Sequence, residues 1–253
     1  MPFTRVCQSR RVTTRAPSPQ SPLPSRASAL AHIRADAAAH RFTEWGQSTL
    51  IDEHTGVPSI DQELFDALHA AAGIAAAFPI GNAGVIHVYG YWFSEVPTPF
   101  GLKRARWADG ALAAAFGLPR DAFHLTGSPA ASASGAPAPT PLQRVAAAMR
   151  ATLESPPPGA LVADAEIPGR SVTGAGARPG AGTSIPPQRS RVVLQRPHDR
   201  LPWALSYGIA APGAAADAPL QLLTAFPVQG DPAPLIAEFA AHPALRWNAV
   251  SNS

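Results

Sequence analysis

The stretch Arg191–Val228, RVVLQRPHDRLPWALSYGIAAPGAAADAPLQLLTAFPV, decides the fold of this chain. It contains three runs rich in branched and aromatic residues, Arg191–Gln195, Trp203–Ala210 and Leu220–Val228, which are typical of strands. Short segments containing Pro, Gly and Asp separate the runs and favour turns. Connections of this kind join neighbouring antiparallel strands, so the stretch predicts an antiparallel meander.

Outside this stretch, apolar residues recur at three- and four-residue spacing, which predicts helices. Two capping boxes, Ser59 with Gln62 and Thr140 with Gln143, predict where two of the helices begin. The expected helices cover Ala29–His40, Ser59–Phe78, Trp107–Phe116, Thr140–Leu153 and Leu235–Ala241. Further strands are expected at Ser48–Asp52, Val85–Phe93, Phe100–Arg106, Ala160–Ile167 and Leu245–Val250. Strands and helices do not alternate regularly, so we predict an α+β fold with a mainly C-terminal antiparallel sheet and about five helices.

The composition divides the chain into four parts. Residues 1–27 are rich in Arg, Ser and Pro and contain no acid, so we expect a disordered leader, with a transit peptide or a misplaced start as alternatives. Residues 127–139 are of low complexity and are expected to form a flexible linker, and Gly169–Gln188 is expected to be a Gly/Pro-rich loop. The segments 28–126 and 140–253 are expected to fold together as one domain.

The net charge of +3 arises at the N-terminus, because the first 35 residues carry six arginines and no acid. The remainder carries −3, which excludes general attraction to nucleic acids, so binding of an anion has to depend on local patches. Two such patches are Lys103, Arg104 and Arg106, and Arg189, Arg191, Arg196 and Arg200. Nineteen of the twenty basic residues are arginine, and alanine and proline abound, which is typical of a chain encoded by GC-rich bacterial DNA.

Cys7 is the only cysteine, so no disulfide can form within the chain. No run of 18 apolar residues occurs, and the N-terminus lacks the apolar core of a secretory signal. We therefore expect a soluble, cytoplasmic protein without a membrane partner.

Functional residues are densest in Val85–Trp107, VIHVYGYWFSEVPTPFGLKRARW, which holds the only lysine and, between Tyr89 and Phe100, five of the eighteen aromatic residues. On a strand, alternation places His87, Tyr89 and Tyr91 on one face. The aromatic rings are suited to stack on a base or sugar, while the cations hold phosphate or carboxylate. We predict that His87 is a general base and that the residues binding the substrate are Tyr89, Tyr91, Trp92, Lys103 and Arg104. The alternative is that the rings fill the core.

The turn between the first two strands of the meander offers a second group. His198 and Arg200 follow Pro197 there, and a histidine with an arginine is the pair that a metal-independent ribonuclease uses as acid–base and as phosphate stabiliser. We include His198 and Arg200 among the predicted catalytic residues. The segment LLTAFPV (Leu222–Val228) resembles the closing strand of some small bacterial ribonuclease toxins, a resemblance confined to seven residues.

One further pattern concerns metal binding. His32, Asp36 and His40 fall on one face of the expected first helix, a spacing that suits a divalent ion, although the nearby Arg34 and Arg41 oppose it. We predict no metal and no tightly bound cofactor.

These observations lead to three functional hypotheses. The first is an enzyme that acts on a small anionic or nucleotide-like substrate. The second is a non-enzymatic binding or regulatory module that uses the aromatic stripe as a protein interface. The third is a metal-independent ribonuclease-like activity.

Overall fold

The computed structural model describes residues 24–98, 101–125, 138–172, 183–242 and 248–250, with backbone only for 170–172 and 183–185. The expected leader and the expected linker lie mostly outside these residues. In the described part, helices pack with antiparallel sheets, which confirms the α+β prediction.

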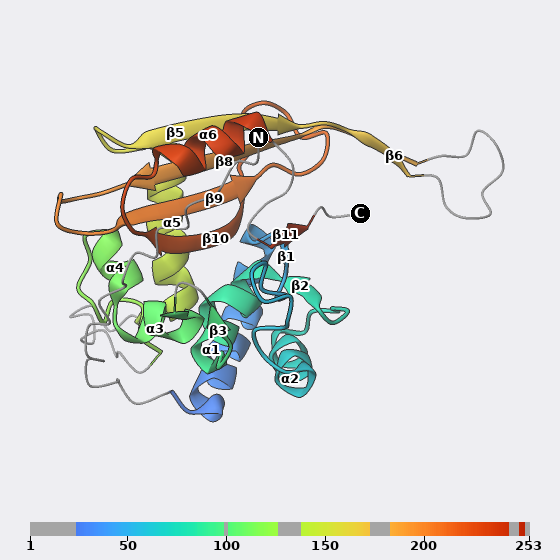
Figure 1. The fold of residues 1–253 in the computed structure, drawn as a ribbon. Coiled ribbons are helices and arrows are strands. Elements are labelled where there is room, and N and C mark those ends of the chain that lie inside the picture. Colours follow the sequence, from blue (N-terminus) through green and yellow to red (C-terminus); the bar gives the residue numbers. More distant parts are fainter. Residues whose placement is uncertain (1–23, 99–100, 126–137, 173–182, 243–247, 251–253) are drawn as a thin grey trace, which may run out of the picture.

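The largest sheet has four antiparallel strands in the order β10-β9-β8-β5 (Figure 1). Its strands are β5 (Leu161–Ile167), β8 (Gln188–Gln195), β9 (Trp203–Ile209) and β10 (Gln221–Val228). The predicted meander is therefore confirmed. The Gly/Pro-rich stretch after β5 is not wholly a loop, because β6 (Arg170–Val172) and β7 (Thr183–Ile185) pair as an arm that extends from the sheet.

Alternation of large and small side chains along β9 decides which helix covers which face. The helices concerned are α5 (Pro141–Glu154) and α6 (Ala233–Ala241). Tyr207 points to one face, where its ring lies 6.2 Å from that of Phe239 in α6. Its neighbour Gly208 faces α5, and a Cβ there would lie 3.1 Å from a methyl group of Leu153. The absence of a side chain thus lets α5 approach, so the two helices cover opposite faces, α6 in front and α5 behind in Figure 1.

Helix α5 begins where the sequence predicts. Thr140 Oγ1 accepts the Gln143 N–H, and the Gln143 side chain accepts the Thr140 N–H at 2.8 Å. These reciprocal bonds satisfy two backbone donors at the helix start, which confirms the capping box.

The first half of the chain packs beside the sheet (Figure 1). Its helices are α1 (Arg26–Ala38), α2 (Gln62–Ala72), α3 (Lys103–Ala108) and α4 (Ala111–Ala115). Its strands are β1 (Gln47–Thr49), β2 (Ile80–Asn82), β3 (Pro97–Thr98) and β4 (Gly101–Leu102), and β1 also pairs with β11 (Ala249–Val250). The Gly46 N–H donates to the Leu222 carbonyl of β10 at 2.9 Å, which joins the two halves.

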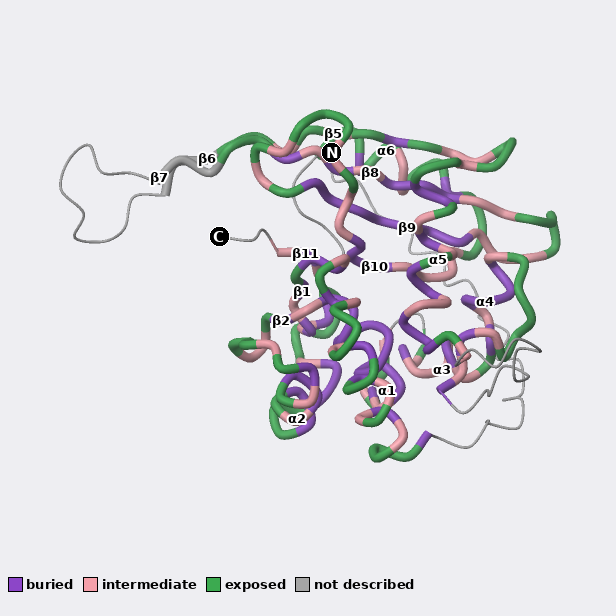
Figure 2. The backbone as a smooth tube through the Cα atoms, turned by 180° about the vertical axis from the view of Figure 1, so that it is seen from behind, coloured by how far each residue is buried: buried purple, intermediate pink, exposed green. Residues whose placement is uncertain are grey.

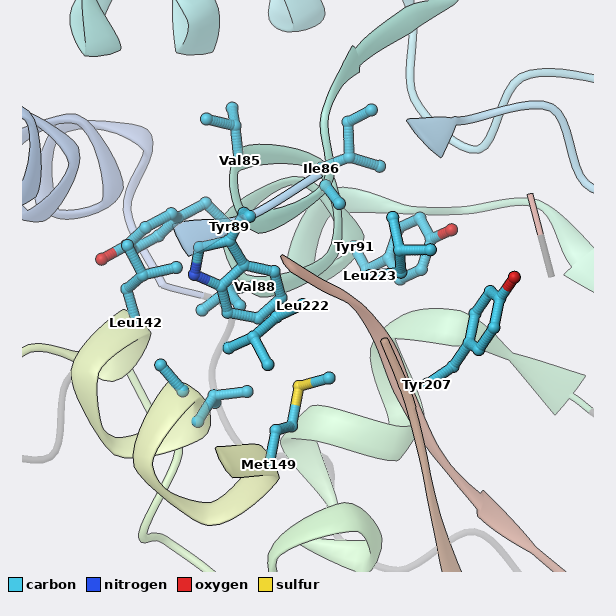
Figure 3. Close-up of a cluster of buried hydrophobic side chains, with 14 of the residues drawn as sticks. Val85, Ile86, Val88, Tyr89, Tyr91, Leu142, Met149, Tyr207, Leu222 and Leu223 are labelled. Atoms are coloured by element: carbon cyan, nitrogen blue, oxygen red, sulfur yellow. The ribbon is translucent and has the colours of Figure 1, made fainter. Parts of the chain in front are cut away.

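The expected strand at Val85–Phe93 is wrong, because this segment is helical. Val85–Tyr89 forms a π-helix and Gly90–Phe93 a 3₁₀ helix. The Asn82 carboxamide accepts the N–H groups of Gly84 and Val85, and thereby caps the start of the helical segment. Branched and aromatic residues favour strands only on a pleated surface, whereas here they fill the space between the sheet and α1 from all sides. Figure 3 shows Tyr89 and Tyr91 pointing to opposite sides of this helix.

Several expected boundaries also differ. Helix α2 is capped by Asp61, whose carboxylate accepts the Leu64 N–H at 2.7 Å, and it ends before Gly73 in the left-handed region, not near Phe78. The expected helix Trp107–Phe116 is interrupted at Gly110, which has a φ of +65°. The strand expected at Phe100–Arg106 is limited to β4, because α3 begins at Lys103. Helix α1 starts at Arg26, within the expected leader.

Buried side chains from both halves form one hydrophobic cluster. It includes Ile33, Leu68 and Tyr89 from the first half and Met149 and Leu205 from the second. Figure 2 shows the buried residues running from β8 and β9 into the helices of the first half. None of the helices in the described ranges is both long and apolar enough to cross a bilayer.

Candidate functional site

His87 is held in the middle of the molecule by the main chain of the sheet. Its Nδ1 lies 2.6 Å from the carbonyl oxygen of Leu223. The register of β10 against β9 shifts between Leu222 and Thr224, so Leu223 is the extra residue of a β-bulge and its carbonyl turns toward the histidine. Because a carbonyl only accepts, Nδ1 carries the proton and Nε2 of the neutral ring has a free lone pair.

The partner of that lone pair is Ser48. Its Oγ lies 3.1 Å from His87 Nε2 and 2.9 Å from the carbonyl oxygen of Asn248. The Asn248 carbonyl already accepts the Thr49 N–H at 2.6 Å, whereas Nε2 has no other donor among the described residues. The Ser48 hydroxyl lies within donor distance of three acceptors, Nε2, the Asn248 carbonyl and the Thr49 carbonyl at 3.3 Å. Donation to Nε2 is the orientation in which a histidine accepts the proton of a serine.

The imidazole of His87 is neutral at physiological pH. Burial, together with the nearby charge of Lys103, lowers its pKa to about 3, against the opposite effect of the hydrogen bond to Leu223. Only 3% of the residue is exposed. The unprotonated Nε2 is thus present whenever the protein is folded near neutral pH.

The only lysine forms a buried ion pair. Lys103 Nζ lies 3.1 Å from Asp52 Oδ2, and the two side chains are 6% and 4% exposed. The other oxygen of Asp52 accepts the N–H groups of His54 and Thr55. Burial raises the pKa of the Asp52 carboxyl, but the charge and hydrogen bond of Lys103 and the backbone donors outweigh it, so the pKa is lowered overall.

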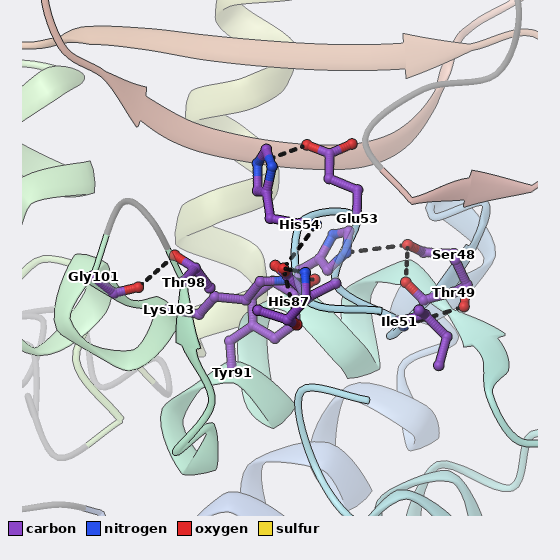
Figure 4. Close-up of polar contacts among 12 residues, drawn as sticks. Ser48, Thr49, Ile51, Glu53, His54, His87, Tyr91, Thr98, Gly101 and Lys103 are labelled. Atoms are coloured by element: carbon purple, nitrogen blue, oxygen red, sulfur yellow. Dashed lines mark hydrogen bonds and ion pairs between the residues drawn. The ribbon is translucent and has the colours of Figure 1, made fainter. Parts of the chain in front are cut away.

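Tyr91 connects the ion pair to the histidine. Lys103 Nζ lies 3.3 Å from the Tyr91 hydroxyl and 4.6 Å from the centre of its ring. His87 and Tyr91 are four residues apart on the helix, and their rings lie 4.9 Å apart. Ser48, Asp52, His87, Tyr91 and Lys103, called the polar cluster below, thus form one connected group (Figure 4).

Arg106 adds a positive charge beside the polar cluster. Its guanidinium lies 6.0 Å from the ring of Phe226, and among the residues that the structure describes it has no hydrogen-bond or ion-pair partner. Burial lowers its pKa, while Tyr91, Asp52 and Glu53 raise it. An arginine keeps its charge in proteins, so this side of the cluster has one unneutralised, half-buried cation.

The structure brings together only three of the predicted site residues, His87, Tyr91 and Lys103. Tyr89 points away, because residues two apart on a helix do not share a face, and its hydroxyl donates to Asp36. Burial and the Asp36 charge raise the pKa of Tyr89 above its usual range. Trp92 packs 5.5 Å from the His124 ring and 6.5 Å from that of Trp107.

The remaining predicted residues lie on the surface. Arg104 pairs with Glu95 at 3.2 Å. His198 and Arg200 belong to the turn between β8 and β9, where His198 Nδ1 accepts the Arg200 N–H, and within the described ranges neither side chain contacts the polar cluster. The rings of Tyr89, Tyr91 and Trp92 are buried, so they present no exposed stripe to a partner protein.

Asp36, the acid in the pattern of His32, Asp36 and His40, is hydrogen-bonded to other side chains. Asp36 accepts hydrogen bonds from Arg41 at 2.8 Å and Thr140 at 2.6 Å, in addition to Tyr89. The ring of His32 lies 2.9 Å from the Leu125 carbonyl. In the described part of the chain no group of three or more His, Cys, Asp or Glu side chains is placed to hold a metal ion.

Ser48, Asp52 and Arg106 were not predicted as site residues. Asp52 had a local signal, since Asp before His54-Thr55-Gly56 is typical of a turn that an Asp side chain closes. Arg106 was recognised only as part of a basic patch. Ser48 had no signal at all, because its partner lies 39 residues away.

The chain matches no protein-family model, no curated protein and no solved structure. Function therefore has to be argued from the geometry of the polar cluster.

Proposed function

We propose that this protein is a hydrolase that acts on a small anionic ester, with Ser48 as nucleophile and His87 as general base. The observation that carries the proposal is the 3.1 Å contact between Ser48 Oγ and the unprotonated Nε2 of His87. A nucleophile and a base within hydrogen-bond distance, with the base oriented by a third group, form the arrangement that serine-dependent acyl transfer requires. Here the third group is the Leu223 carbonyl.

The proposed reaction has two steps, acylation of Ser48 and hydrolysis of the acyl-serine. As Ser48 Oγ attacks the ester carbonyl carbon, His87 Nε2 takes the hydroxyl proton, and the resulting imidazolium returns it to the leaving alcohol. A water molecule then attacks the acyl-serine and gives its proton to Nε2, and the imidazolium returns this proton to Ser48 Oγ as the bond to the acyl carbon breaks, which releases the acid and the free serine. The Leu223 carbonyl stabilises the imidazolium, since it accepts the Nδ1–H throughout.

Of the two cations at the polar cluster, Lys103 is neutralised by Asp52, whereas Arg106 has no hydrogen-bond or ion-pair partner among the residues that the structure describes. Its guanidinium carries five N–H donors for an anionic substrate. A guanidinium in partly dry surroundings binds a carboxylate or phosphate more strongly than one in water. We therefore assign recognition of the substrate's anionic group to Arg106.

Access to Ser48 depends on β11. The serine is fully buried, and Ser48 pairs with Ala249 while Gln47 pairs with Val250. A strand of two residues forms few ladder bonds, so local opening of β11 costs far less free energy than global unfolding. Substrate entry is proposed to follow this opening.

Labelling with a fluorophosphonate probe tests the nucleophile. Mass spectrometry of the folded wild type is expected to locate the adduct on Ser48, because the probe reacts with serines activated by a histidine. Ser48→Ala should abolish the adduct and His87→Gln should slow labelling at least tenfold. Ala249→Pro should accelerate it, because a proline disfavours the left-handed conformation of the residue before it, here Asn248 (φ of +64°), and the pairing of β11 is thereby weakened.

Ser94→Ala is the matched control, since Ser94 is also fully buried but its hydroxyl has no partner among the described residues. It should label like the wild type. Absence of an adduct on Ser48 in both the wild type and Ala249→Pro would refute the proposal.

The assignment of Arg106 has its own test. Hydrolysis of mono-4-nitrophenyl succinate is compared with that of neutral 4-nitrophenyl butyrate. Arg106→Gln should lower kcat/KM for the anionic ester about tenfold and leave the neutral ester unchanged, because one charged hydrogen bond is lost. Arg104→Gln, which removes a surface arginine paired with Glu95, is the control and should change neither. Equal effects of Arg106→Gln on both esters would contradict the assignment.

A further inference from the structure

A second site lies away from the polar cluster, between the C-terminal end of α5, β8 and the segment that leads into β10. It is a cavity of about 290 Å³, close to the lower limit for small-molecule sites in proteins. Its charged lining residues are Arg150, Glu154, Arg189, Arg191 and Asp217. None of the five residues of the polar cluster lines it.

Two of the three arginines are already neutralised. Arg150 lies 3.0 Å from Glu44 and 3.4 Å from Glu154. Arg191 donates two hydrogen bonds to the carboxylate of Asp164, at 2.7 and 2.9 Å. Both guanidinium groups therefore form walls of the cavity with little capacity left for a ligand.

Arg189 differs from its neighbours. Its Nη2 donates to the Ala218 carbonyl at 2.7 Å, but its Nε is buried and has no partner in the described part of the chain. No carboxylate of the described residues lies within ion-pair distance of it. A buried N–H without an acceptor is unfavourable, and an entering carboxylate would supply the missing acceptor.

An unpaired acid adjoins this arginine. Asp217 precedes Ala218, the residue that Arg189 holds, and its exposed carboxylate has no partner among the residues that the structure describes. The uncharged lining residues are apolar and include Leu153, Leu220 and Leu222. The cavity thus combines one available cation, one available anion and an apolar surface.

We propose that this cavity binds a free α-amino acid with an apolar side chain. The carboxylate of the ligand would pair with Arg189, its ammonium with Asp217, and its side chain would pack against the leucines. A simple inorganic anion would leave Asp217 and the leucines unused, and Asp217 and Glu154 would repel a polyphosphate.

Isothermal titration calorimetry of the full chain tests this proposal. The probes are L-leucine, L-valine, L-methionine and L-phenylalanine, and at least one is expected to bind with a millimolar or lower Kd. For the amino acid that binds best, the analogue without the carboxylate (for leucine, leucinamide) and the one without the ammonium (4-methylvalerate) should bind at least tenfold more weakly. These ligand arms use the wild-type protein, so they do not depend on the folding of any variant.

The protein arms use Arg189→Gln and Asp217→Asn, each expected to weaken binding about tenfold through loss of one charged contact. Arg196→Gln is the matched control, because Arg196 lies in a turn of the same sheet and pairs with Asp199 outside the cavity. The proposal is overturned if none of the four amino acids binds, if the analogues bind as well as the amino acid, or if Arg189→Gln and Arg196→Gln behave alike.

Discussion

The C-terminal sheet and the polar cluster are both buried, but they are built in different ways. Strands β8, β9 and β10 pair with their sequence neighbours, and most of their buried side chains are apolar, with Val192, Leu194 and Leu205 fully buried. The polar cluster joins side chains that are distant in sequence, such as Ser48 and His87, which are 39 residues apart. The sheet is stabilised by pairing between neighbouring strands and by apolar packing, which recur along each strand. The cluster depends on a few specific contacts whose loss leaves a buried charge or donor without a partner.

The largest expected effect comes from breaking the ion pair. Asp52→Asn keeps an acceptor for the His54 and Thr55 N–H groups but leaves the Lys103 ammonium buried without a countercharge. We expect a loss of about 3–5 kcal/mol in the free energy of unfolding, measured by urea denaturation. The double variant Asp52→Asn/Lys103→Met should recover most of this loss, because it removes the charge as well. A cost below about 1 kcal/mol for Asp52→Asn would show that the pair is not isolated from water.

The sheet should respond to loss of volume and not to loss of charge. Leu205→Ala removes a fully buried side chain and is expected to cost about 2–5 kcal/mol. Val162→Ala on β5 is the control, because Val162 is 43% exposed, and it should cost less than about 1 kcal/mol. Similar losses for the two variants in urea denaturation would contradict the assigned core.

The pH dependence of stability distinguishes the cluster from the sheet. The pKa of His87 is about 3 when folded and about 6.5 when unfolded, so the unfolded state binds more protons between these values. Stability from this group is therefore complete above about pH 6.5 and decreases as the pH falls toward 3. Between pH 7 and pH 5 the wild type should lose about 2 kcal/mol more than His87→Gln.

The comparison with His87→Gln isolates this effect, because His69, whose pKa burial also lowers, contributes equally to both proteins. Parallel pH profiles for the two proteins would mean that His87 is solvated or protonated in the folded state.

The smallest effect is expected at the surface of the sheet. Arg196 pairs with the exposed Asp199 at 2.7 Å and lies over the Trp203 ring at 4.7 Å. Arg196→Ala should lower the free energy of unfolding by less than about 1 kcal/mol in urea denaturation at physiological salt, since exposed pairs are well screened. A larger cost would mean that the turns contribute part of the sheet's stability.

The polar cluster differs in one respect from the group of residues that the sequence places on one face. Concentration of rare residues in Val85–Trp107 pointed to His87, Tyr91 and Lys103, and the fold brings these three side chains into one cluster. The assumed strand wrongly added Tyr89 to their face, because period-two alternation groups residues i and i+2, whereas a helix groups i and i+4. Asn82, the residue that caps this helix, was the local signal against a strand.

Elements that depend on residues close together in the chain can be predicted from the sequence alone. The capping box at Thr140 and the strand runs of the meander act through residues a few positions apart, so their pattern suffices to predict them. The contact between Ser48 and His87 arises only from tertiary packing, and so does the contact of the ring with the Leu223 carbonyl at the bulge. No periodicity encodes such contacts, because they exist only after the two halves of the chain have packed together.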